Sequence, residues 1–412
     1  MNRYAQAWES LLMNPLVRDD ARIKTFVKAE KTNFSAKVDP APRIISPRDP
    51  RYNLMLGVFT KPLEGVLYKL LNEMCGGVTV MKGLNAVEVG QAISSAWDDF
   101  IDPVAVGCDA KRFDQHTHTE ALKFEQMVYK MFFVGSDRAE LSELLNWQLR
   151  SDCVAYLEEA VVKFPFEIRA SGDMNTGLGT CVIACSMVHS YFDGRCKYRL
   201  INNGDDCVLL VERKDLSAVD GFHDYCRELG YFMEMEAPVD RLERIEFCQA
   251  HPVWDGETYR MVRNFPGSLA KDCTSLLPLD TEKAWKQWAH DIGHAGVALC
   301  AGIPVMQRFY ERLRDVGTGT FGDHNVLTDT GWYYLKHGLE SKVRTISEQS
   351  RVSFYDAFGV TPADQMAAEE DLDKVKIDFT TRLMGQNITL QAKTHNEYTN
   401  TTIDNLVTSF FD

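Results

Sequence analysis

The spacing of apolar and polar residues predicts short strands set among helices. Apolar side chains recur at helical spacing over residues 84–100 and again over residues 119–149. Residues 104–108 instead form a short apolar run that ends at Asp109, and residues 198–201 and 208–211 form two more such runs. The segment between these last two runs reads Asn-Asn-Gly-Asp-Asp, which is a strong hairpin signal. The pattern therefore predicts a mixed α and β protein with a hairpin near its centre.

Weaker patterns complete the prediction. A Gly-rich turn at residues 171–179 precedes a helix over about 180–191, and another helix is expected over about 216–229. Short strands are expected near 245–249 and 258–262, and the chain beyond about 270 has mostly helical spacing. Residues 22–62 contain several prolines, which favours extended segments and turns over one long helix. These prolines are Pro40, Pro42, Pro47, Pro50 and Pro62.

Composition narrows the class of protein. A length of 412 residues fits two or three average domains or one large protein with subdomains, and 45% hydrophobic residues suffice for a packed core. The eleven cysteines form no Cys-x-x-Cys pair, which favours a reducing compartment over a secreted disulfide framework. No apolar run approaches the ~18 residues of a membrane span. We therefore expect a soluble chain whose membrane attachment, if any, comes from elsewhere.

Charge is unevenly distributed along the chain. The net charge is −14, yet the segment from Arg22 to Lys61 contains nine basic residues and only three acidic ones. The local potential decides where phosphate groups bind, so this segment is a candidate for contacts with nucleic acid. On its own, such a run indicates a solvated basic surface just as readily.

Three carboxylates are the main candidates for chemistry. Asp109 follows a buried strand, and Asp205 and Asp206 occupy the hairpin tip. If the two strands are neighbours, the carboxylates converge, and divalent cations would neutralise them. Carboxylate oxygens suit Mg²⁺, with Mn²⁺ as a possible substitute. Two such ions about 4 Å apart would activate a 3′-hydroxyl and stabilise departing pyrophosphate. The hairpin turn alone is a weak signal, because Asn, Gly and Asp are ordinary turn formers.

The order of the motifs strengthens this hypothesis. Asp114, five residues after Asp109, is placed to accept a hydrogen bond from a ribose 2′-hydroxyl. The loop that begins at Ser171 and Gly172 allows close backbone approach to a template or nucleotide. The basic segment offers Lys and Arg to offset the charge of a triphosphate.

These blocks resemble motifs A, B and C of viral RNA-dependent RNA polymerases. Residues 107–116 (GCDAKRFDQH), 171–176 (SGDMNT) and 204–206 (GDD) are similar in wording to the tombusvirus-like plus-strand RNA viruses. Residues 28–31 and 42–53 resemble motif F, which lines the path of the incoming nucleotide, and residues 82–86 and 246–249 also match. The resemblance spans roughly residues 24–275.

The resemblance implies an α/β (α+β) right-hand polymerase fold with fingers, palm and a mostly helical thumb. The palm would hold an antiparallel sheet with helices. The expected boundaries are 1–100 for fingers with the basic segment, 101–118 for palm with motif A, 119–165 for a fingers insertion, 166–265 for palm with motifs B to E, and 266–412 for thumb and C-terminal tail.

Site residues follow from the motifs in three groups. The metal ligands would be Asp109, Asp205, Asp206 and the backbone carbonyl of Ala110, with Asp206 the weaker ligand. Ribose and nucleotide selection would fall to Asp114, Ser171, Gly172, Thr176 and Thr180. The triphosphate and template would meet Lys28, Lys31, Arg43, Arg48 and Arg51.

Two positions depart from the family pattern. Thr180 stands where many such polymerases carry an Asn that helps to read the 2′-hydroxyl. Glu234 lies near the place where a Lys often donates a proton to pyrophosphate, so no general acid is assigned.

The predicted function is replication of a plus-strand viral RNA genome, with NTPs added to a nascent RNA 3′ end on an RNA template. Related replicases carry a longer N-terminal region with membrane-targeting segments. We therefore expect a viral membrane-anchored auxiliary replication protein as partner, and a location in the host cytoplasm at membrane-associated replication complexes. One alternative is a reverse transcriptase or other palm-type polymerase, which would use dNTPs readily. Another is a non-enzymatic replication scaffold, which would show no Mg²⁺- or Mn²⁺-dependent primer extension.

Overall fold

The computed structural model describes residues 2–31, 41–156, 160–276, 279–319, 332–377 and 379. The chain forms two compact units. The first comprises Met1–Lys28, Ala41–Met81 and Phe100–Pro238, and the second comprises Ala29–Pro40, Lys82–Asp99 and Val239–Asp412. Each unit is therefore assembled from segments that are distant in sequence.

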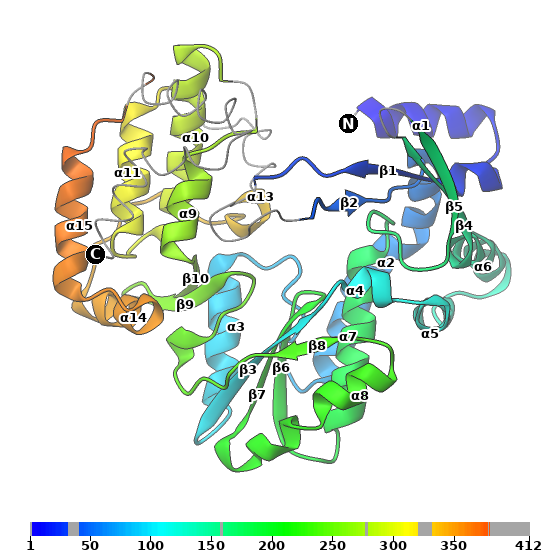
Figure 1. Cartoon of the computed structure of the whole chain (residues 1–412), viewed down its shortest axis with the longest axis horizontal. Coiled ribbons are helices and arrows are strands. Elements are labelled where there is room, and N and C mark those ends of the chain that lie inside the picture. Colours follow the sequence, from blue (N-terminus) through cyan, green and yellow to red (C-terminus); the bar gives the residue numbers. More distant parts are fainter. Residues whose placement is uncertain are drawn as a thin grey trace. The chain divides into compact units, whose positions relative to one another are not determined.

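The first unit is built on a four-stranded antiparallel sheet (Figure 1). Its order is β6 (Tyr198–Asn202), β7 (Asp206–Glu212), β3 (Pro103–Ala110) and β8 (Met233–Met235). The interior of β7 is fully buried, as a continuous apolar run requires. Helix α7 (Thr176–Phe192) packs on β6, and α8 (Phe222–Glu228) packs on β8. The predicted strands and their hairpin are confirmed.

Helix α2 (Pro50–Met74) corrects the prediction of extended structure up to residue 62. Pro50 occupies the first turn, where proline needs no hydrogen-bond partner, and the Asp49 side chain caps the helix by accepting from the Arg51 backbone N–H at 2.9 Å. Apolar residues at helical spacing then face the core, and this burial outweighs Pro62 inside the helix. They are Tyr52, Leu56, Phe59, Leu63, Leu67 and Leu71.

A second sheet in the same unit has the order β2-β1-β4-β5. Strands β1 (Ile23–Val27) and β2 (Ile44–Ile45) agree with the extended structure predicted there. The hairpin of β4 (Ser151–Tyr156) and β5 (Val161–Phe166) was not predicted, because β5 is mostly exposed and lacks apolar alternation. β1 pairs with β4 in parallel.

The remaining helices of the first unit refine the predicted ranges. Helix α1 (Asn2–Met13) opens the chain, and a 3-10 turn (Arg18–Ala21) follows it. The stretch predicted over 119–149 is two helices, α5 (Thr119–Lys130) and α6 (Gly135–Leu149), because Gly135 has a φ of +59° that breaks the helix. A short α4 (Phe113–His116) lies after β3. A 3-10 helix (Arg213–Val219) forms the first part of the helix predicted over 216–229, before α8.

The second unit joins helices to a two-stranded hairpin. Helix α3 (Ala86–Asp98) packs on β10 (Tyr259–Arg263), which pairs with β9 (Ala250–Trp254). A strand over 245–249 is wrong: a 3-10 turn (Leu242–Arg244) lies just before that stretch, and positive φ values of 53° at Cys248 and 60° at Gln249 turn the chain before β9 begins. The helices that follow are α9 (Phe265–Asp272), α10 (Glu282–Cys300), α11 (Met306–Val316), α13 (Trp332–Leu335), α14 (Glu348–Phe358) and α15 (Pro362–Lys374).

The helices and the cysteines bear on the predictions of no membrane span and of a reducing compartment. None of the helices within the described residues has the length and apolarity needed to cross a bilayer. All eleven cysteines lie in the described part of the chain and are free thiols.

Candidate active site

Asp109 and Asp206 lie directly opposite each other in the β3–β7 ladder. Residues opposite in an antiparallel pair project from the same face of the sheet, with Cβ atoms about 4.5–5.5 Å apart. The turn that presents Asp205 and Asp206 is fixed by the buried Asn202 side chain. Its Nδ2 donates to the Gly204 carbonyl at 2.7 Å and its Oδ1 accepts from the Gly204 N–H at 3.1 Å. Gly204 has a φ of +95°, which glycine tolerates best.

The donor set of this ladder suits a hard divalent cation. Over the described ranges of the chain, no three His, Cys, Asp or Glu side chains are gathered into a ready-made metal cage. Mg²⁺ does not need such a cage, because one or two carboxylates, waters and substrate phosphates complete its shell. The opposed carboxylates of Asp109 and Asp206, with Asp205 beside them, therefore fit Mg²⁺ in chemistry. Ala110 is the last residue of β3 and follows Asp109 directly.

A third acidic residue continues the row across the sheet. Glu234 in β8 lies opposite Asp109 on the other edge of β3. Its carboxylate forms an ion pair with Lys111. The resemblance predicts a Lys that donates a proton near this position. This chain instead has Glu234, whose carboxylate is paired with the ammonium group of Lys111.

Ser171 and Asp114 are joined by a hydrogen bond. The Ser171 Oγ donates to the Asp114 Oδ2 at 2.6 Å. Burial is the largest influence on the pKa of Asp114 and raises it, while the Ser171 bond and the charge of Arg169 act in the opposite direction and Asp205 adds to the increase. Since the charge of Asp205 acts on Asp114, the predicted metal-binding and ribose-reading groups belong to one electrostatic neighbourhood.

The other residues predicted to read the ribose, Thr176, Thr180 and Gly172, make contacts within the loop and the first turns of α7. Thr176 Oγ1 donates to the Ala170 carbonyl at 3.0 Å. Thr180 Oγ1 donates to the Thr176 carbonyl at 2.8 Å inside α7, so its proton is engaged within its own helix. Gly172 has a φ of +135°, and a Cβ there would lie 3.1 Å from the Cα of Pro47. The loop is therefore held closely against the segment before α2.

A buried polar network that was not predicted supports this loop. Arg169 forms an ion pair with Glu125 and donates to the Thr176 carbonyl at 3.2 Å, and its Nε lies 3.8 Å from Asp114 Oδ1. Asn175 Nδ2 donates to Glu125 at 2.7 Å, and Gln148 Nε2 donates to Asn175 Oδ1 at 2.8 Å. These side chains tie α5 and α6 to the start of α7.

One signal in the sequence points to this network. Glu125 and Gln126 stand on the same helix face as Leu122 and Tyr129, and all four are buried. A carboxylate on an apolar helix face requires a buried partner. The identity of that partner, Arg169, is not visible in the sequence.

Two of the arginines predicted to bind phosphate, Arg48 and Arg51, form contacts within the fold. Arg48 is 4% exposed, and its guanidinium donates to Asp173 at 2.6 Å, to Ser151 Oγ at 2.6 Å and to a backbone carbonyl. Arg51 Nη1 donates to Ser10 Oγ at 2.6 Å and so links α2 to α1. Both arginines brace the fold, because their donors are already used.

The lysines and Arg43 are placed differently. Lys28 and Arg43 are exposed and adjacent, since the Lys28 backbone N–H donates to the Arg43 carbonyl at 2.8 Å where β1 ends and β2 begins. Lys31 belongs to the second unit, where its Nζ donates to the Lys271 carbonyl at 2.8 Å. Among the predicted basic residues, Lys28 and Arg43 are therefore the pair that presents charge at the surface of the first unit.

Comparison with known proteins agrees with the motifs. Residues 1–380 match the family model described as viral RNA dependent RNA polymerase. The chain belongs to the viral RNA-dependent RNA polymerases. It is 40% identical over 398 residues to the RNA-directed RNA polymerase of Tobacco necrosis virus (strain D), covering 95% of this chain and 55% of that protein.

Further relatives support the tombusvirus-like resemblance. The RNA-directed RNA polymerase of Turnip crinkle virus is 42% identical over 381 residues, covering 91% of this chain and 48% of that protein. That of Carnation mottle virus is 40% identical over 379 residues, covering 91% of this chain and 49% of that protein. The chain thus spans about half the length of the curated relatives it matches.

Proposed function

We propose that this chain carries the RNA-directed RNA polymerase activity of a plus-strand RNA virus, joining NTPs to the 3′ end of a growing RNA on an RNA template. The observation that carries the proposal is the register of β3 and β7, which sets Asp109 opposite Asp206. The family membership and the hydrogen bond between Asp114 and Ser171 in the same unit support it.

We assign separate roles to the acidic, ribose-reading and basic residues of the site. Asp109, Asp205, Asp206 and the carbonyl of Ala110 would hold divalent cations, Mg²⁺ or Mn²⁺. When bound, the cations lower the pKa of the 3′-hydroxyl and offset the charge of pyrophosphate. Asp114 accepts a hydrogen bond from the ribose 2′-hydroxyl. Ser171 orients the Asp114 carboxylate by donating a hydrogen bond to it. Lys28 and Arg43 attract the triphosphate or template through their exposed charges.

The right-hand description is part of the proposal. The β6-β7-β3-β8 sheet would be the palm, within residues 101–118 and 166–265. Residues 1–100 and 119–165 would form the fingers, and residues 266–412 the thumb and tail. The antiparallel sheet with α7 and α8 on its strands supports the palm assignment.

Partners follow from the same proposal. RNA template, nascent RNA and NTPs are the substrates of the reaction. A viral membrane-anchored auxiliary replication protein would recruit the polymerase to membrane-associated replication complexes in the host cytoplasm.

Primer extension by the purified chain tests the proposal. We expect Asp205→Asn and Asp109→Asn each to lower Mg²⁺-dependent NTP incorporation by at least about 100-fold, because cation binding supplies several kcal/mol of transition-state stabilisation. The matched control is Asp220→Asn, a charge removal at an exposed residue after the 3-10 helix. Full activity in both site variants, with unchanged melting temperature, would exclude the assignment. Equal use of dNTPs and NTPs by the unaltered protein would instead favour a reverse transcriptase.

A further inference from the structure

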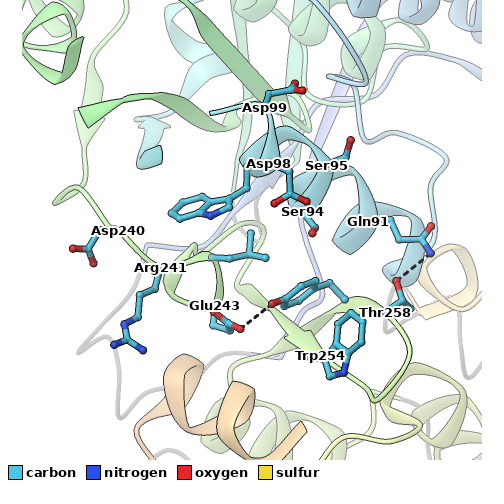
Figure 2. A pocket seen from close by; sticks show the side chains of 13 residues that line it. Gln91, Ser94, Ser95, Asp98, Asp99, Asp240, Arg241, Glu243, Trp254 and Thr258 are labelled. Atoms are coloured by element: carbon cyan, nitrogen blue, oxygen red, sulfur yellow. Dashed lines mark hydrogen bonds between the residues drawn. The ribbon is translucent and has the colours of Figure 1, made fainter. Parts of the chain in front are cut away.

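A pocket of about 820 Å³ opens within the second unit, whereas the carboxylates of the β3–β7 ladder belong to the first. Helix α3 contributes one wall, the segment from Asp240 to Glu243 a second, and the β9–β10 hairpin a third. Figure 2 shows Asp98, Glu243 and Trp254 facing this space from three different elements. Nothing in the polymerase reaction proposed above uses it.

Three aromatic side chains line the pocket. Trp97, Trp254 and Tyr259 all contribute, and the last two meet edge to face with ring centroids 5.3 Å apart. The Tyr259 hydroxyl donates to Glu243 Oε1 at 3.2 Å, and the Ser353 hydroxyl donates to the same oxygen at 3.1 Å. Rings held in this way lose little conformational entropy when a ligand stacks on them.

Acidic side chains outnumber basic side chains in the lining. Four carboxylates line the pocket, those of Asp98, Asp99, Asp240 and Glu243, against one guanidinium, that of Arg241. Arg241 donates to Asp356 at 2.7 Å, and Figure 2 shows its guanidinium directed away from the pocket. Burial raises the pKa of the Tyr259 hydroxyl most, and the nearby charges of Glu243 and Asp98 raise it further.

These properties select the ligand. The carboxylates repel phosphate groups, which disfavours NTPs and RNA backbone. A guanidinium group is planar, stacks on aromatic faces and donates in pairs to carboxylates. We propose that this pocket binds an arginine side chain in a basic peptide segment of a partner protein. The proposal rests on the second unit alone and stands whether or not the polymerase assignment holds.

Fluorescence anisotropy of a labelled nonapeptide tests this inference with the full chain. Three peptides with a Gly/Ser background would carry two Arg, two Lys or two Glu residues at the same positions. We expect the Arg peptide to bind at least about 3-fold more tightly than the Lys peptide, because only a guanidinium both stacks and pairs bidentately. The Glu peptide should not bind. Equal affinity for the Arg and Lys peptides would mean attraction to charge alone and would overturn the proposal.

Variants localise the binding. Asp98→Asn combined with Asp240→Asn should weaken Arg-peptide binding by about 10-fold, and Trp254→Leu by a few-fold through the lost stacking surface. The matched control is Asp280→Asn combined with Glu370→Gln, two exposed acids of the same unit outside the pocket. Equal loss in the control, or none in the pocket variants, would place the peptide elsewhere. Displacement of the peptide by AMP at equal ionic strength would identify a nucleobase pocket and refute the arginine assignment.

Discussion

The Oγ of Ser171 donates a 2.6 Å hydrogen bond to Oδ2 of Asp114, across 57 residues of sequence. The second carboxylate oxygen, Oδ1, lies 3.8 Å from Nε of Arg169. The Asp114 carboxylate is therefore held from two sides, by a hydroxyl at the start of the Gly-rich loop and by a buried guanidinium. If Asp114 reads the ribose 2′-hydroxyl, as proposed above, its discrimination against a 2′-hydrogen depends on this fixed orientation.

Removing the Ser171 hydroxyl should loosen sugar selection. In Ser171→Ala, the preference for NTP over dNTP should fall by about 10-fold, since a hydrogen bond to a charged group contributes about 1.5–3 kcal/mol. The measurement is the ratio of kcat/KM for a matched NTP and dNTP in primer extension. A lower rate with an unchanged ratio would show that Ser171 serves only the loop.

Thr180 provides the contrasting case. Its hydroxyl donates within α7 to the Thr176 carbonyl, so we expect Thr180→Val to keep the NTP to dNTP ratio within about 2-fold. Valine matches the shape of threonine and removes only the hydroxyl. A ratio that falls as far as in Ser171→Ala would mean that Thr180 turns toward the sugar when substrate binds.

The buried pair of Glu125 and Arg169 should be a large contributor to stability. Both side chains are at most 1% exposed. Glu125→Gln leaves the buried Arg169 guanidinium with only the Asp114 carboxylate, 3.8 Å away, as counter-charge. This should lower the free energy of unfolding by about 3 kcal/mol. Urea denaturation gives this value, and Glu120→Gln, at an exposed position on the same helix, should leave it nearly unchanged.

A double-mutant cycle separates the pair from its surroundings. Glu125→Gln combined with Arg169→Gln should be less destabilised than the sum of the single variants, because the double variant removes both charges of the pair, whereas each single variant leaves one of them buried. Additive effects would show that each side chain acts through its other partners, such as Asn175 and the Thr176 carbonyl.

The parts of the site that could be predicted depend on local sequence. The apolar run before Asp109 and the Asn-Asn-Gly turn before Asp205 specify a strand and a hairpin by themselves. The pairing of β3 with β7 was only a condition of the prediction, because the residues of one strand do not identify its neighbour in the sheet, and the structure supplies it. Burial of Arg48 could not be predicted, because Asp173 lies 125 residues away and a basic residue in a basic segment resembles its exposed neighbours. The pairing of Arg169 with Glu125, 44 residues apart, was hidden for the same reason.

Helix packing in the second unit gives a last test, at Gly296 in α10. A Cβ there would lie 2.1 Å from the ring of Tyr310 in α11. That ring cannot retreat, because its hydroxyl donates to Asp272 at 2.6 Å and its edge meets Trp332 with centroids 5.5 Å apart. Gly296→Ala should therefore lower the melting temperature, at a cost of about 1–3 kcal/mol or more from overpacking.

At Gly65 in α2, nothing lies within 4 Å of the added Cβ. Gly65→Ala should accordingly stabilise by about 0.5–1 kcal/mol through lower backbone entropy in the unfolded chain. Equal melting temperatures for the two variants would contradict this packing of α10 on α11.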